Sequence, residues 1–198
     1  MLTETNANKN KAIPVGNLDF YLCPKNATNT IRYCSYLFNG GKKEISDYRN
    51  ENISTGAVSG YKILQLGNRA NSKIEYNNER TDSIKIAVIR DPLDRFISSL
   101  QWVNYKYKLN LTLEEAVNNV PNDIHFYPQY YYYGEQVSKY DHLIYANNIT
   151  SLIFQLTGKD LGNIHKGKNP KPVAYDITKD IEFKINSLYK KDFDLGYC

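Results

Sequence analysis

The sequence has no long apolar run, and its first residues lack the short apolar segment of a signal peptide. Residues 1–17 are polar, and no stretch approaches the roughly 18 consecutive apolar residues that a membrane-spanning helix requires. We therefore expect a protein without a membrane span and without a recognisable export signal. A cytoplasmic location fits both absences.

Cysteine is scarce as well. The three cysteines, Cys23, Cys34 and Cys198, cannot all pair within one chain, and none of them lies in the C-x-x-C spacing of a zinc site. Neither a disulfide framework nor a metal site is predicted, and a reducing compartment is expected.

Glycine is missing where a nucleoside triphosphatase needs it. A Walker A loop has the pattern G-x-x-x-x-G-K-[ST], but no glycine lies between Cys23 and Phe38, the stretch that contains Lys25. A nucleoside triphosphatase is therefore disfavoured.

The composition is that of a compact globular protein. The chain has 198 residues, of which 41% are hydrophobic and 23% charged, values that suit one domain with its own core. Its net charge of +4 favours an anionic ligand. The basic residues are dispersed and form no recognition motif, so no nucleic-acid partner is expected. We attribute the 18 tyrosines to biased composition rather than to carbohydrate-stacking surfaces.

Strand and helix patterns alternate along the chain. Three short apolar stretches predict buried strands: LDFYLCP (18–24), SIKIAVIRDP (83–92) and YDHLIYA (140–146). A helical pattern follows each strand, over 28–38, from Pro92 to about Tyr107, and over 149–157. This alternation predicts an α/β fold of three layers, P-loop-like, in which helices flank a central and mainly parallel sheet.

Two further helices are predicted outside these units. Residues 112–120 begin with Thr112 and Glu115 in capping-box spacing, and residues 176–193 carry an apolar stripe of Ile177, Ile181, Ile185 and Leu188. Residues 1–16 are expected to form a loose arm and residues 17–198 a single domain. Residues 42–82 are polar and show little periodicity.

Lys25 lies between the first predicted strand and its helix. Free backbone N–H groups and the positive end of the helix dipole meet at such a turn and suit a phosphate or sulfate oxygen. Lys25 would add a full charge, and Thr28 and Thr30 would add hydroxyl donors. The alternative is a solvated turn in which Asn and Thr only cap the helix.

A second group of cationic residues follows the next strand. Arg90 ends that strand, while Arg95 and Ser98 lie three residues apart on one face of the helix that follows. Two guanidiniums and a hydroxyl would hold a second phosphate. The alternative is a capped helix in which Arg95 pairs with Asp91.

The two segments CPKNATNTIR and AVIRDPLDRFISS resemble the cofactor motifs of sulfotransferases that use 3'-phosphoadenosine 5'-phosphosulfate (PAPS). They are most similar to the Golgi-type carbohydrate sulfotransferases of family 2. The resemblance implies that one loop grips the 5'-phosphosulfate and that the R-D-P-x-x-R-x-x-S pattern grips the 3'-phosphate. The first set is Lys25, Asn26, Ala27, Thr28, Asn29 and Thr30, and the second is Arg90, Arg95 and Ser98.

Three further segments extend the resemblance over nearly the whole chain. DIHFYPQ (123–129) is similar to an H-W-x-P-Q segment with Phe126 in place of tryptophan. YDHLIYANNI is similar to a strand and turn whose usual glutamate is replaced here by Asn147 or Asn148. INSLYKKDFDLGY is similar to the closing helix of the family.

The resemblance implies a sulfotransferase-like domain over 17–198. It would transfer a sulfuryl group in line, without a metal, to an acceptor hydroxyl on a carbohydrate and release adenosine 3',5'-bisphosphate. Lys25 would stabilise the leaving phosphate, and His125 would be the base, because an imidazole with a pKa of about 6.5 exchanges protons near neutral pH. The alternative for His125 is a structural histidine whose hydrogen bonds are satisfied before a Pro turn. Lys166 and Lys168 would belong to a basic loop that closes over the cofactor, or to a plain solvated loop.

The animal enzymes of this class carry an N-terminal membrane anchor, so its absence here suggests a bacterial or viral cytosolic relative. Two other functions stay open. One is a nucleotide-binding module of the same fold that has lost catalysis, because the tryptophan and glutamate positions are substituted. The other is a P-loop-like small-molecule kinase, which would need the glycine-rich loop that the chain lacks.

Overall fold

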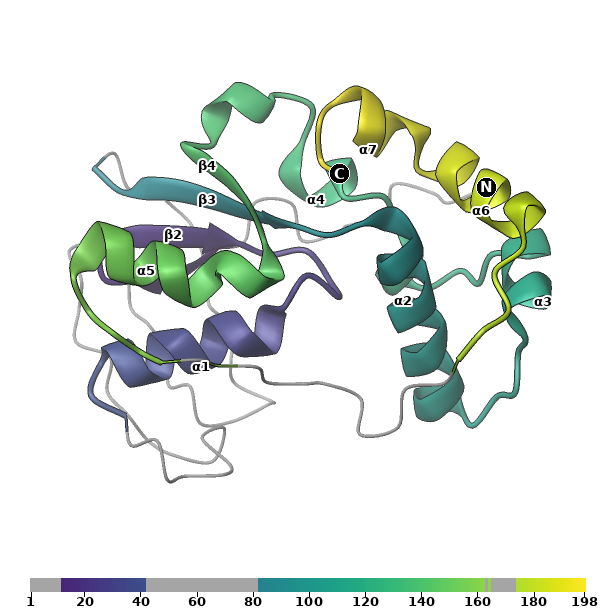
Figure 1. The fold of residues 1–198 in the computed structure, drawn as a ribbon, viewed down its shortest axis with the longest axis horizontal. Coiled ribbons are helices and arrows are strands. Elements are labelled where there is room, and N and C mark those ends of the chain that lie inside the picture. The colour runs from purple at the N-terminus through teal and green to yellow at the C-terminus, as the bar shows by residue number, and fades with distance from the viewer. Residues whose placement is uncertain (1–11, 42–81, 163, 165–173) are drawn as a thin grey trace.

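A four-stranded sheet forms the centre of the computed structural model, which describes residues 12–41, 82–162, 164 and 174–198 (Figure 1). The strands are β1 (Ala12–Val15), β2 (Leu18–Tyr21), β3 (Ile84–Ile89) and β4 (His142–Tyr145), and they lie side by side in this order. β1 pairs with β2 in antiparallel fashion, whereas β2–β3 and β3–β4 are parallel. The expected α/β class with a mainly parallel sheet is confirmed.

The prediction of a loose arm over residues 1–16 is wrong for Ala12–Val15, because these residues form a fully buried strand. Gly16 closes the hairpin to β2 with φ of +63°, and a Cβ there would come within 2.7 Å of the Phe38 ring. Ser35 on helix α1 also donates to the Pro14 carbonyl at 2.7 Å. The polar residues before β1 and the Pro and Gly within and after it concealed this strand from the sequence pattern.

The helices that follow the strands begin and end as predicted. They are α1 (Thr28–Phe38), α2 (Pro92–Tyr107) and α5 (Ile149–Thr157). Asp91 caps α2 by accepting the Asp94 N–H at 3.0 Å, and Gly158 ends α5 in the left-handed conformation that glycine adopts at low cost. Local chemistry therefore determines these boundaries.

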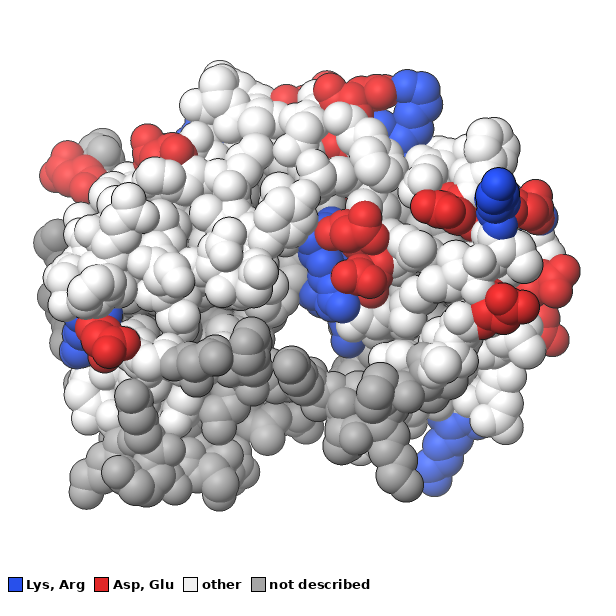
Figure 2. Space-filling view, viewed as in Figure 1, with Lys and Arg blue, Asp and Glu red and all other residues white. Residues whose placement is uncertain are grey.

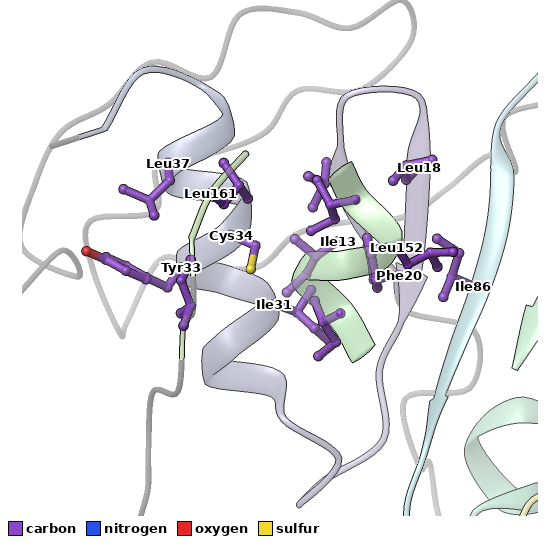
Figure 3. Close-up of a cluster of buried hydrophobic side chains, with 14 of the residues drawn as sticks. Ile13, Leu18, Phe20, Ile31, Tyr33, Cys34, Leu37, Ile86, Leu152 and Leu161 are labelled. Carbon is purple, nitrogen blue, oxygen red and sulfur yellow. The ribbon is translucent and has the colours of Figure 1, made fainter. Parts of the chain in front are cut away.

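Helices α1 and α5 cover one face of the sheet (Figure 1). Alternate strand residues such as Phe20 and Ile86 point to this face and pack against Ile31 of α1 and Leu152 of α5 (Figure 3). Burial of these apolar side chains stabilises the layer, because each contributes about 1.5–3 kcal/mol when fully removed from water.

Tyrosines cover the opposite face. Ala87 and Ile89 of β3 pack there against a cluster from the short helix α4 (Tyr130–Tyr133) and from the C-terminal segment. The buried members include Tyr127, Tyr132, Tyr133, Tyr140 and Tyr197. Part of the tyrosine content is thus core material, which composition alone did not indicate.

A second packed region lies beside the sheet (Figure 1). α2 extends into it and packs with α3 (Leu113–Asn118), η2 (Ile124–Phe126) and α6 (Lys179–Leu188) around Phe96 and Phe126. Three more short helices complete the described chain: η3 (Val137–Lys139), η4 (Ala146–Asn148) and α7 (Lys190–Asp194). No helix within the described ranges is long and apolar enough to cross a bilayer.

Two predictions for this region have different outcomes. The capping box of α3 is confirmed, since the Thr112 side chain accepts the Glu115 N–H and Glu115 accepts the Thr112 N–H. The apolar stripe is only partly correct, because Ile181 and Ile185 are buried but Ile177 precedes α6 and is 42% exposed.

The burial of β1 predicts that Ile13→Ala lowers the free energy of unfolding by about 2–5 kcal/mol, since Ile13 is 1% exposed. The matched change Ile177→Ala removes the same atoms from an exposed side chain and should cost less than about 1 kcal/mol. Urea denaturation followed by circular dichroism measures both. Equal costs would contradict the placement of β1 in the core.

Candidate functional site

The loops that follow β2 and β3 meet at one edge of the sheet. Because these strands are parallel neighbours, their carboxyl ends lie side by side. The Arg90 guanidinium donates from Nη1 to the Lys25 carbonyl at 3.0 Å, so the two predicted anion loops are in direct contact. Both belong to one site.

The loop after β2 has a conformation that usually requires glycine. Lys25 has φ of 69° and Ala27 has φ of 59°, both left-handed, and such residues cost about 1–2 kcal/mol each when a Cβ is present. The Asn26 N–H and the Thr28 hydroxyl both donate to the Cys23 carbonyl, at 3.1 and 3.3 Å. The loop is therefore wound tightly without any glycine.

The amino-terminal end of α1 follows this loop. Ala27 is its N-cap and supplies no side-chain hydrogen bond, and no acidic residue lies in the first turn. The left-handed Ala27 precedes the right-handed helix, a change of hand that turns successive N–H groups toward one concavity. The positive end of the α1 dipole is thus not neutralised by a carboxylate of its own first turn.

Asn26 was expected to bind the cofactor, but its side chain lies inside the protein. It is 1% exposed, and its amide nitrogen donates to the Val88 carbonyl at 2.7 Å and to the Gln129 side-chain oxygen at 2.5 Å. Its backbone N–H is also occupied within the loop. Asn26 therefore fixes the loop against β3 and does not offer a donor to a ligand.

Gln129 clamps the two loops together. Its side-chain oxygen accepts from Asn26 and from the Arg90 N–H at 3.0 Å, while its side-chain nitrogen donates to the Arg90 carbonyl at 3.0 Å and the Tyr197 carbonyl at 2.6 Å. Gln129 is fully buried. Its own N–H donates to Asp192 at 2.7 Å, which fixes the backbone from which the side chain projects.

Arg95 was expected at the 3'-phosphate, but its side chain is fully buried. The guanidinium donates to the carbonyls of Pro24 at 3.4 Å, His125 at 3.2 Å and Tyr127. The prediction that Arg95 contacts the 3'-phosphate is therefore not supported, and Arg95 instead positions other segments. It ties α2 to the Lys25 loop and to the segment that carries His125.

The two cations at the mouth of the site affect each other. Burial, and then the nearby charge of Arg90, lowers the pKa of Lys25 to about 8. Burial also lowers the pKa of Arg90, although Asp94 opposes the shift. A bound anion would relieve this mutual repulsion.

Figure 2 shows a recess at the centre of one face, where basic side chains lie beside acidic ones. The recess separates the surface over α1 and α5 from the surface over α2, α3 and α6.

His125 and Lys25 both lie near the ring of Trp102. The Lys25 amine is 5.5 Å from the centre of the Trp102 ring, and the His125 ring is 5.5 Å from the same ring. Burial lowers the pKa of His125 below its ordinary value, against the pull of the Asp123 carboxylate that contacts Nδ1. His125 is thus a neutral imidazole at neutral pH.

The remaining predicted site residues have mixed placements. Thr28 bonds to its own loop, Asn29 is exposed on the first turn of α1, and Thr30 is buried. Ser98 is half-buried on α2 and has no hydrogen-bond partner in the described part of the chain. Lys166 and Lys168 lie outside the described residues, so their predicted loop stays a prediction.

Three residues of the site were not predicted from the sequence. Gln129 and Asp123 lie within the segment DIHFYPQ that drew attention to His125, and the spacing of Asp123 two residues before His125 was the available signal. Trp102 carried no signal, because its place at the site depends on how α2 lies against the Lys25 loop.

No protein-family model, curated protein or solved structure matches this chain.

The clamp predicts that Gln129→Leu lowers the free energy of unfolding by about 2–4 kcal/mol, because it leaves several buried polar groups of Arg90, Asn26 and Tyr197 unpaired. Gln136→Leu is the matched control at an exposed position and should change stability by less than about 0.5 kcal/mol. Thermal unfolding by calorimetry compares them. A cost at Gln129 as small as that at Gln136 would contradict the clamp.

Proposed function

We propose that the chain is a sulfotransferase that uses PAPS and sulfates a hydroxyl group, on a carbohydrate acceptor. One observation carries the proposal: the 3.0 Å hydrogen bond from Arg90 to the Lys25 carbonyl joins two cationic loops at the ends of parallel strands. PAPS has a phosphosulfate at one end of an adenosine and a phosphate at the other, so it requires two adjoining anion sites.

The residues present fit the two ends of this nucleotide. Lys25 and the first turn of α1, which lacks acidic residues, suit the 5'-phosphosulfate. The left-handed Lys25 and Ala27 support the proposal that this loop is P-loop-like. Arg90 and the hydroxyl of Ser98 suit the 3'-phosphate. Asn26, Gln129 and Arg95 hold the two sites together from inside the protein.

When bound, the nucleotide supplies the sulfuryl group, whose bond to the phosphate oxygen breaks as the acceptor oxygen bonds to sulfur. The Lys25 ammonium stabilises the negative charge that develops on the leaving phosphate. His125 accepts the proton of the acceptor hydroxyl at its ring nitrogen Nε2, because Nδ1 is already engaged with Asp123. Proton and leaving-group charge are thus handled by two different residues around Trp102.

The Asp123–His125 pair favours a transferase over a module that only binds nucleotide. Binding two phosphates needs cations and N–H donors but no neutral base, and such a base is held beside the cationic loops. The substituted family positions, Phe126 and Asn147 or Asn148, lie outside this pair.

The two cations predict tight and selective binding of adenosine 3',5'-bisphosphate. We expect Lys25→Met and Arg90→Met each to weaken binding by about 10- to 100-fold, because each removes a charged hydrogen bond of about 1.5–3 kcal/mol. Isothermal titration calorimetry measures the affinities, with ATP and magnesium as the competing ligand. Transfer of labelled sulfate from PAPS to a panel of glycans then tests activity.

Lys184→Met is the matched control, since it removes the same charge from an exposed ion pair with Asp180 on α6 and should leave affinity unchanged. Preference for ATP with magnesium would favour the small-molecule kinase and refute the proposal. Selective bisphosphate binding without transfer to any acceptor would favour the catalytically inactive binding module.

The two titrating groups predict a bell-shaped dependence of kcat/KM on pH. Activity should fall at low pH as His125 gains a proton, at a pKa below the ordinary 6.5, because a protonated base cannot accept another proton. It should fall at high pH as Lys25 loses its proton, with a pKa of about 8. The kcat/KM profile reports these groups in the free enzyme. In Lys25→Met the alkaline limb near pH 8 should disappear, and its persistence would contradict the role of Lys25.

A further inference from the structure

The Asp123 carboxylate is held from three directions. Its Oδ1 accepts the His125 backbone N–H at 2.9 Å and also contacts the His125 ring at Nδ1. Its Oδ2 accepts the Tyr107 hydroxyl at 3.2 Å. Both oxygens therefore have partners, and the carboxylate cannot rotate without breaking one of these bonds.

The charge state of Asp123 determines which ring nitrogen of His125 carries the proton. Burial raises the pKa of Asp123, but the two hydrogen bonds from His125 and the one from Tyr107 outweigh this effect and bring the pKa below its ordinary value. An ionised carboxylate has no proton to donate. Nδ1 must therefore be the protonated nitrogen of the neutral ring, which leaves the lone pair on Nε2.

We infer that Asp123 and Tyr107 are positioning residues, which hold His125 in the tautomer that presents Nε2 as a proton acceptor. This inference rests on the proposed function for its catalytic consequence. Neither residue contacts the reacting atoms. Asp123 orients the ring, and Tyr107, near the end of α2, fixes the carboxylate that does so.

The exposure of these side chains would allow an acceptor to reach the His125 ring. The side chains of His125 and Asp123 are 18% and 12% exposed, and Tyr107 is 50% exposed. Nε2 has no hydrogen-bond partner among the residues that the structure describes, so its lone pair is not used by the fold.

The charges that face His125 come from three parts of the chain. Asp123 favours the protonated ring, whereas Lys25 from the β2–α1 loop and Lys106 from α2 disfavour it. Lys106 lies over the rings of Tyr107, at 4.7 Å, and Trp102, at 6.0 Å. Without Asp123, Lys25 and Lys106 would be the charges from the described residues that act on the ring, and it would be a weaker base of undefined tautomer.

The tautomer of His125 can be read directly from ¹⁵N chemical shifts of the histidine rings in the protein alone. The chain has three histidines, so the spectrum of His125→Gln identifies the signal. At a pH where the ring is neutral, we expect a protonated Nδ1 and an unprotonated Nε2. In Asp123→Asn, which keeps an acceptor for the His125 backbone N–H, we expect a lower His125 pKa and a larger fraction of the Nε2–H tautomer.

The same variants are then compared in the sulfate-transfer assay. We expect Asp123→Asn to lower kcat by about 10- to 1000-fold, which is part of the roughly 100- to 10,000-fold that a general base contributes, because His125 itself remains. Tyr107→Phe should lower kcat by about 3- to 10-fold with little change in KM. Tyr105→Phe is the matched control, because Tyr105 is 80% exposed and is two residues from Tyr107 on the same helix.

A wild-type ring with its proton on Nε2, or an unchanged tautomer and pKa in Asp123→Asn, would overturn the inference. Identical kcat values for Tyr107→Phe and Tyr105→Phe would show that Tyr107 is not a positioning residue. The NMR result stands whether or not transfer is detected. The expected tautomer without any transfer would count against the proposed function and leave the positioning of His125 supported.

Discussion

The hydrogen bonds that Gln129 makes inside the protein hold the whole site together. Two parallel strands bring their ends to one edge of the sheet, but the backbone groups of the loops beyond those ends are left without partners from the sheet. Gln129 satisfies the N–H and the carbonyl of Arg90 and also holds Asn26, so both loops share one buried polar anchor. Asp192 and Arg95 extend this network to the C-terminal segment and α2.

This anchor allows an arrangement that is unfavourable by itself. Lys25 and Ala27 adopt left-handed conformations, and Lys25 and Arg90 carry like charges close together in a partly buried place. Such local costs persist only where surrounding contacts over-determine the conformation, and they are common where a ligand supplies the missing compensation. An anion with charge at two points would neutralise both cations. The internal network thus holds two like charges close together at the ends of parallel strands.

The elements next to the site were predictable because the chemistry that defines them is local. The Pro92 start and Asp91 cap of α2, the Gly158 end of α5 and the apolar alternation of β3 all lie within a few residues of the structure they determine. β1 was missed because Pro14 and Gly16 interrupt its pattern, and it is a strand only through pairing with β2 and packing against α1. Its formation depends on contacts with residues distant in the sequence.

The sequence by itself determined that cationic residues follow two strands and that a histidine lies in the segment 123–129. Only the tertiary structure decided which of those side chains are used up inside the protein. Arg95 and Asn26 have the composition of ligand-binding residues, yet both are buried and bind backbone carbonyls. The physical reason is that a polar side chain satisfies whatever donor or acceptor lies within reach, and for these two residues those groups come from segments far away in the chain.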